Sequence, residues 1–298
     1  SKKLLTSAVD TNVLILAGVT AENSGNKDAA ATYYGRLADL KMKGDGFESV
    51  YRFLVGHYFA KGDMAKFEKY KALGSELYPR SDFFKFDKVD FAVGLVEGFS
   101  DKIKALEGIL ANDPDNYKAN EIVGELIYDT LNAEGGTKIE NPDQWEAKMV
   151  TAFNKAAAAK KDFEIPYLYL GDHFFNKAAS VGQLRDAHAK AMRAKAKTGV
   201  KPAPEDVAKR DQLEKQYGDA LEKAREPYEK AAGILANKQH GGGDKGQEVR
   251  DKAQHKKACA GLSEIFAYKK SQAKAGSPDF LKYEAEAKKW DDAYNAIH

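Results

Sequence analysis

The sequence has little of several things, and each scarcity excludes a class of protein. Cysteine occurs once in 298 residues, at Cys259, so neither an internal disulfide nor a zinc site built from several cysteines is available. Forty-seven basic residues stand against 45 acidic ones, and this balance argues against a dedicated nucleic-acid binder, which usually carries a marked basic excess. The most apolar run covers only Val13 to Val19, far short of the roughly 20 residues that cross a bilayer. We therefore expect no transmembrane segment.

Hydrophobic residues are nevertheless plentiful, at 43% of the chain. They recur at intervals of three and four almost throughout, which is the period of an amphipathic helix that faces a core. Alanine, lysine and glutamate are abundant and favour helix. The eight prolines fall mostly between the periodic segments. The pattern predicts an all-α protein of about twelve helices joined by short turns.

Two prolines that each close a predicted helix, Pro79 and Pro114, are 35 residues apart. Before Pro79 the chain has a large residue, a leucine followed by a small residue, an aromatic, a turn and a second apolar helix, namely Tyr51, Leu54, Val55, Tyr58, Gly62, Asp63, Phe67, Tyr70 and Leu77. This order resembles the tetratricopeptide repeat, in which helix pairs recur about every 34 residues. The small residue is expected to let the two helices of a pair approach closely.

The same order recurs along the chain. The further copies are Leu14, Ala17, Gly18 and Ala21; Asn120, Val123, Gly124 and Ile127; Tyr167, Leu170, Gly171 and Phe174; and Cys259, Leu262, Ser263 and Phe266. The resemblance implies one domain over residues 1–298, a right-handed superhelical solenoid of about six helix pairs. The expected pairs cover residues 8–43, 46–80, 82–115, 117–162, 164–236 and 248–298. The third is degenerate because its first helix lacks the small residue, and no copy has the family's tryptophan.

Two insertions interrupt the period. The first helix of the fifth pair continues past Asn176, and a return helix is predicted from Val207 to about Leu235, with Pro227 as a potential kink. These helices form a projecting hairpin whose inserted part covers about residues 177–222. The second insertion, residues 238–247, is a glycine-rich polar loop.

No catalytic or metal-ligating motif stands out, so we expect a non-enzymatic protein without a cofactor or metal. The six histidines lack the spacing of known zinc motifs. His240 and the three glycines after it resemble the oxyanion-hole motif of lipases, but that motif needs a nucleophile elbow on a sheet, so a simple turn is expected. Cys259 lies between two alanines and is expected to pack in the core.

In the tetratricopeptide family, the exposed side of each first helix lines a concave face on which partners usually bind. Carried over by the motif positions, this face consists of Arg52, Phe59, Glu121, Glu125, Tyr128, Leu168, Asp172, Phe175, Glu264 and Tyr268. Aromatic residues interleaved with charges suit recognition of a peptide or an extended chain. The alternative is that the aromatics only fill space between neighbouring pairs.

A basic patch is a further candidate. Lys190, Arg193 and Lys197 share one side of the predicted hairpin and could dock an acidic or phosphate-rich partner. The alternative, which we favour, is a solvated hairpin whose lysines face acidic residues of the return helix, such as Glu205 and Glu214.

These features favour a scaffold or adaptor that binds a peptide or protein segment, and no nucleic acid, on its concave face. An alternative is an all-helical glycan-binding or hydrolytic protein with a carboxylate-lined groove, for which Glu121, Glu125 and Asp172 are the candidates. A third possibility is self-association through the aromatic-rich last pair. In its overall sequence character, rather than in any single motif, the chain resembles tetratricopeptide proteins of bacterial cell envelopes. We expect a chain whose signal peptide has been removed, which favours the periplasm or cell envelope over the cytoplasm.

Overall fold

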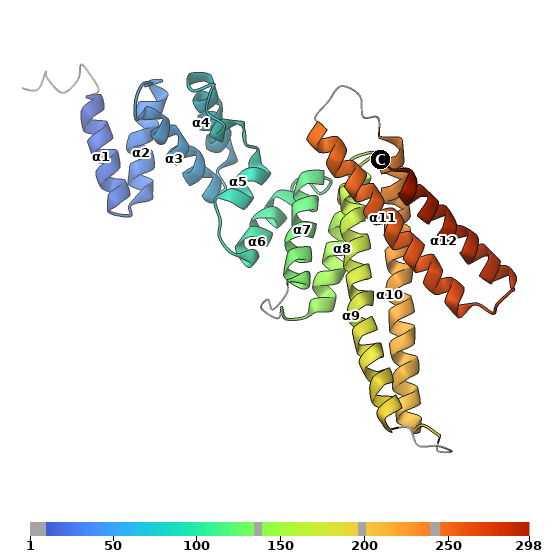
Figure 1. Ribbon diagram of the computed structural model, residues 1–298. Helices are drawn as coiled ribbons and strands as arrows, with labels where there is room; N and C mark the ends of the chain where they lie inside the picture. Colours follow the sequence, from blue (N-terminus) through green and yellow to red (C-terminus); the bar gives the residue numbers. More distant parts are fainter. Residues whose placement is uncertain (1–9, 134–138, 196–200, 239–244, 298) are drawn as a thin grey trace, which may run out of the picture. The chain divides into compact units, whose positions relative to one another are not determined.

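The computed structural model describes residues 10–133, 139–195, 201–238 and 245–297 of the chain (Figure 1). In these ranges, twelve α-helices and one short 3-10 helix make up the regular secondary structure, and no strand occurs. The expectation of an all-α protein is confirmed. None of the described helices combines the length and the apolar character that crossing a membrane requires. The chain divides into two compact units, Ser1–Ile109 and Leu110–His298.

The first unit consists of short helices joined by tight turns. Its elements are α1 (Thr11–Asn23), α2 (Lys27–Asp39), α3 (Phe47–Ala60), α4 (Met64–Leu77), the 3-10 helix η1 (Phe83–Lys85), α5 (Lys88–Gly94) and α6 (Phe99–Leu110), which ends at the boundary with the second unit. Asp10, Asn26 and Asp63 cap α1, α2 and α4, because each side chain accepts a hydrogen bond from a backbone N–H of the first turn. Each of α1 to α4 packs on the next, around fully buried residues such as Leu54 and Phe67.

The second unit contains longer helices. They are α7 (Tyr117–Asn132), α8 (Pro142–Ala159), α9 (Ile165–Lys195), α10 (Pro204–Asn237), α11 (Lys245–Gln272) and α12 (Pro278–Ala296). They pack as the pairs α7–α8, α9–α10 and α11–α12, and α9 also contacts α7, α8 and α11. Figure 1 shows the α9–α10 hairpin extending beyond the other helices of this unit. Pro227 lies inside α10 without ending it.

Glycines allow the helices of three pairs to approach closely. A methyl group at Gly124 of α7 would lie only 2.5 Å from the nearest ring atom of Phe153 on α8. The same relation holds between Gly171 of α9 and Tyr228 of α10, where the distance would be 2.4 Å. Gly18 of α1 lies equally close to the Tyr34 ring on α2. The small residues therefore do what the sequence pattern predicts, since each makes room for an aromatic ring of the partner helix.

The segment expected to form the third pair differs from the other pairs. Residues 82–115 fold into η1, the seven-residue α5, and α6, and α5 and α6 do not pack along each other as the other consecutive pairs do. The absence of a small residue in the first helix of this copy is consistent with this difference. The tip of the hairpin at 196–200 and most of the expected glycine-rich loop, including His240, lie outside the described residues.

Candidate binding surface

Three helices of the second unit, α7, α9 and α11, bring together half of the residues expected on the concave face. Asn116 caps α7 by accepting a hydrogen bond from the backbone N–H three residues later. Val123 and Ile127 on the apolar side of α7 are buried. Glu121 and Glu125 lie one helical turn apart on a neighbouring side and keep part of their surface exposed. The amphipathic pattern of α7 therefore places these two carboxylates at the surface.

Burial and like charge raise the pKa values of the two glutamates. For Glu121, burial is the largest cause and the negative charge of Glu125 is the second, and they raise its pKa to about 7 against the opposing charges of Lys160 and Lys118. Burial also raises the pKa of Glu125, while a hydrogen bond with Tyr169 lowers it. No ion pair joins either glutamate to a described residue. Their negative charge is therefore poorly compensated.

Two tyrosines and an aspartate continue this surface onto α9. The rings of Tyr128 on α7 and Tyr169 on α9 meet edge to face, with centroids 4.8 Å apart. Burial and then the negative charge of Asp172 raise the pKa of Tyr128. The Asp172 carboxylate accepts a hydrogen bond of 2.8 Å from the Tyr228 hydroxyl and pairs with the Lys257 ammonium of α11. Asp172 is thus held in place by residues of two other helices.

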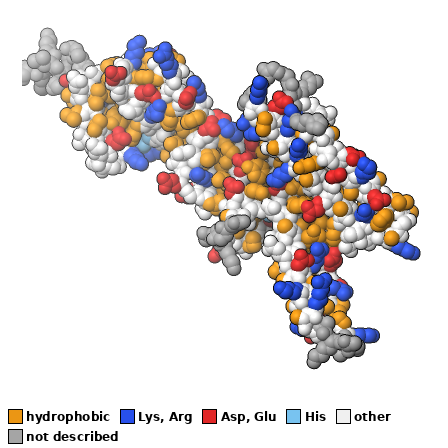
Figure 2. All heavy atoms as spheres, in the orientation of Figure 1, with side chains coloured by type: hydrophobic (Ala, Val, Ile, Leu, Met, Phe, Trp, Pro, Cys, Tyr) orange, Lys and Arg blue, Asp and Glu red, His pale blue; other side chains and the backbone are white. Residues whose placement is uncertain are grey.

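We call the surface formed by Glu121, Glu125, Tyr128, Asp129, Tyr169 and Asp172 the carboxylate–tyrosine face. Figure 2 shows acidic and hydrophobic side chains lying side by side over the part of the second unit where α7, α9 and α11 run. Glu264 is exposed on α11, and its charge contributes to raising the pKa of Tyr228. Five of the residues expected on the concave face, counting Glu264, are thus in this region.

Three other expected residues of this unit have different surroundings. Leu168 is only 5% exposed and therefore belongs to the core rather than to an exposed face. Phe175 packs against Tyr228, with ring centroids 6.1 Å apart. Tyr268 donates a hydrogen bond of 2.9 Å to the Glu214 carboxylate of α10, so it serves the contact between α10 and α11.

The two candidates in the first unit also differ from each other. Phe59 is half-buried between the rings of Phe67 and Phe91, at 5.4 and 5.8 Å, and is a packing residue. Arg52 is exposed, pairs with Glu48 at 2.6 Å and lies 5.1 Å over the Phe83 ring. It lines a pocket of about 760 Å³ between α3 and the segment that follows α4.

The expected basic patch is described only in part. Lys190 and Arg193 are exposed on α9, and Lys197 lies outside the described residues. Neighbouring Lys195 pairs with Asp206 of α10 at 3.2 Å. Arg185 lies 4.3 Å over a tyrosine ring of α10. Part of the basic charge of the hairpin is thus neutralised or packed internally.

Several residues near the face were not expected from the sequence. Tyr169 and Lys257 come from different repeats, and no local pattern joins them to Asp172. Asp129 follows Glu125 by four residues, and that spacing was a usable signal. His173 is buried, with its Nε2 3.0 Å from the Glu146 carboxylate, and hydrogen bonding from His173 is the main reason that the pKa of Glu146 is lowered to about 2.

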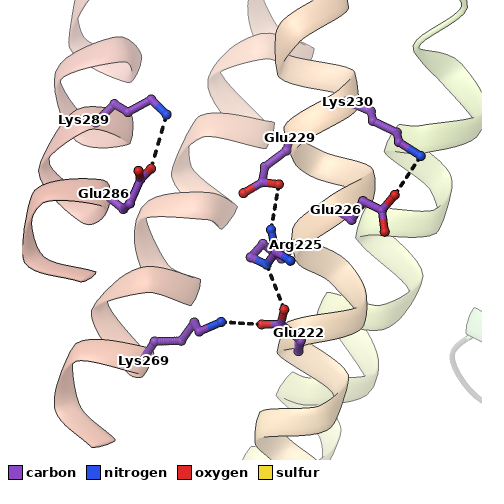
Figure 3. A network of polar contacts seen from close by, with 8 residues as sticks. All are labelled: Glu222, Arg225, Glu226, Glu229, Lys230, Lys269, Glu286 and Lys289. Carbon is purple, nitrogen blue, oxygen red and sulfur yellow. Dashed lines mark hydrogen bonds and ion pairs between the residues drawn. The ribbon is translucent and has the colours of Figure 1, made fainter. Parts of the chain in front are cut away.

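A groove with a volume of about 820 Å³ lies elsewhere on the second unit, between α8 and α10 over α9. Its α10 rim is already occupied by ion pairs (Figure 3). Arg225 bridges Glu222 and Glu229, and Lys230 pairs with Glu226 at 2.8 Å. A charged ligand in this groove would have to replace these contacts, whereas Glu121 and Glu125 on the carboxylate–tyrosine face have no ion-pair partner among the described residues.

The remaining chemical candidates are packing residues. Cys259 is fully buried, as expected, and burial raises the pKa of its thiol to about 11. Among the described residues, no group of three or more histidine, cysteine, aspartate or glutamate side chains is placed to hold a metal ion. No protein-family model matches the chain, and no curated protein matches it either.

Proposed function

We propose that the chain is a scaffold or adaptor of the tetratricopeptide type that binds a peptide or protein segment on the carboxylate–tyrosine face. In this proposal the paired helices are repeats of a right-handed solenoid, and the α5–α6 segment is its degenerate member. The observation that carries the proposal is the meeting of Glu121, Glu125, Tyr128 and Asp172 on one surface built from first helices. Tyrosine supplies large contact area together with a hydrogen-bonding group, and it is common at the centres of interfaces.

A library of random twelve-residue peptides, selected on the whole purified chain, tests this function. We expect recovered peptides whose affinity falls at least about tenfold when Tyr128→Ala is introduced, because the substitution removes an interface aromatic. Tyr294→Ala is the matched control, since this tyrosine is 39% exposed on α12 and lies outside the face. If no selected peptide depends on Tyr128, the proposal is wrong.

A glycan-binding or hydrolytic protein is the second candidate, and one observation favours it. The pKa of Glu121, raised to about 7, suits a general acid. Glycoside hydrolysis needs two carboxyl groups at a set separation across a sugar, and Glu121 and Glu125 are neighbours on one helix. Turnover of chromogenic glycosides that is abolished by Glu121→Gln would establish this function, and its absence together with peptide binding would favour the scaffold.

A further inference from the structure

Three carboxylates of the carboxylate–tyrosine face, all on α7, have no ion-pair partner among the described residues. Glu121, Glu125 and Asp129 follow one another along α7 at intervals of four residues, and we call them the carboxylate row. None of the three forms an ion pair with a described residue, and the charges of Glu125 and Asp129 act on each other. On α10, by contrast, Glu229 pairs with Arg225 and Glu226 pairs with Lys230.

The cations near the row are engaged in other contacts. The Lys160 ammonium lies 4.1 Å over the Phe163 ring and 4.6 Å over the Tyr117 ring. Lys257 pairs with Asp172. Lys160 and Lys118 lower the pKa of Glu121, but burial and Glu125 outweigh them. A cation on a partner would therefore stabilise the ionised form of these carboxylates by pairing with them.

The row does not stand alone, because aromatic surface lies beside it. Tyr128 and Tyr169 are both half-buried, and Tyr169 bonds to Glu125 while its ring stacks on Phe153 at 5.2 Å. Rings fixed in this way have little side-chain freedom to lose when a partner packs on them. The aliphatic stems of lysine and arginine pack well on such rings, and their charged ends are attracted to ring faces.

The spacing of the row matches one form of partner. Four residues of α-helix advance about 6 Å, so neighbouring carboxylates of the row are separated by about that distance along the axis. In an extended chain, every second side chain points the same way, at a repeat of roughly 6.6 Å. Basic side chains at alternate positions of an extended segment can thus each meet one carboxylate of the row.

We propose that the carboxylate–tyrosine face binds an extended protein segment with lysine or arginine at alternate positions. This inference rests on the proposed function and adds the chemistry of the partner. The basic side chains pair with Glu121, Glu125 and Asp129, and the intervening part of the segment packs on Tyr128 and Tyr169.

A fluorescently labelled peptide Ser-Lys-Ser-Lys-Ser-Lys-Ser is the probe, and fluorescence anisotropy with the whole chain measures its affinity. We expect binding that Glu121→Gln combined with Glu125→Gln weakens at least about tenfold, because two charge-assisted contacts are lost. The peptide with glutamate in place of lysine should not bind. A peptide with its three lysines adjacent should bind more weakly than the alternating one.

The control variant combines Asp211→Asn with Asp291→Asn. It likewise replaces two carboxylates by amides, at two exposed positions outside the face, and we expect less than about a threefold loss of affinity. Equal losses in the two double variants would mean that only the overall charge matters, and the proposal would fall. It would also fall if the lysine peptide did not bind, or if the Glu121 and Glu125 substitutions left its affinity unchanged.

The peptide library separates failure of this inference from failure of the proposed function. Selected peptides that depend on Tyr128 but contain no basic residues would preserve the scaffold function and overturn the partner chemistry. Selected peptides that do not depend on Tyr128 would overturn both. Alternating basic residues among the Tyr128-dependent peptides are the expected result.

Discussion

Replacing Gly124 by alanine tests the helix packing that positions the carboxylate–tyrosine face. The new methyl group would lie 2.5 to 2.7 Å from three ring atoms of Phe153, whereas carbon atoms in contact prefer about 3.5 to 4.0 Å. Phe153 is fully buried, so its ring has no solvent space into which it can move. Overpacking of this kind costs up to about 3 kcal/mol, and alanine recovers about 1 kcal/mol of helix propensity. We expect Gly124→Ala to lower the free energy of unfolding by about 2 kcal/mol.

Urea denaturation followed by tryptophan fluorescence measures this loss specifically, because both tryptophans, Trp145 and Trp290, lie in the second unit. The matched control is Gly233→Ala on α10, where an added methyl group meets nothing within 4 Å. This control should gain about 0.5 to 1 kcal/mol from helix propensity alone. Combining Gly124→Ala with Phe153→Leu should recover part of the loss. If Gly124→Ala proved as stable as Gly233→Ala, the close approach of α7 and α8 would be refuted.

Two further predictions concern buried charge. Lys238→Ala removes the cation that pairs with Glu164 at 2.7 Å and with Asp251 at 3.3 Å, and both carboxylates are only 3% exposed. We therefore expect urea denaturation to show a loss of about 3 kcal/mol in the free energy of unfolding. The control Lys215→Ala, in an exposed pair with Asp219, should cost less than about 0.5 kcal/mol. Glu121→Gln should stabilise the fold by about 2 kcal/mol at pH 7.5 and by almost nothing near pH 4.5, and an equal effect at both pH values would contradict the raised pKa of Glu121.

The helices and their pairing could be predicted from the sequence because their causes are local. Apolar spacing, capping residues and turns recur within each segment. The need for a small residue opposite an aromatic ring of the partner helix is also visible within a single copy of the motif. Gly124 and Gly171 illustrate this, since each was singled out from the sequence and each lies against a ring. At residues 82–115 the motif itself is degenerate, and there α5 and α6 do not pack along each other.

The composition of the face could be predicted only in part, because it depends on helix rotation and on contacts between repeats. One residue corresponds to about 100° around a helix, so a shift of one position separates the buried Leu168 from Tyr169, which reaches the face. The pair between Asp172 and Lys257 joins positions 85 residues apart on two different helices. The sequence pattern indicates neither the rotation of α9 nor this contact.

The raised pKa of Glu121 links the stability of the fold to its proposed use. Between pH 4.5 and about 7 the folded chain retains a proton on Glu121 that the unfolded chain has lost, so this group stabilises the protein as the pH falls and destabilises it as the pH rises. His57 and His255 act in the opposite direction, because burial lowers their pKa values, but they are present in both wild type and Glu121→Gln and cancel in the comparison. A partner lysine that pairs with the carboxylate row would offset the free-energy cost of ionising Glu121 in the folded chain. Glu121→Gln should therefore make the chain more stable at neutral pH and a weaker binder of the lysine peptide, and only a carboxylate kept for binding predicts both effects together.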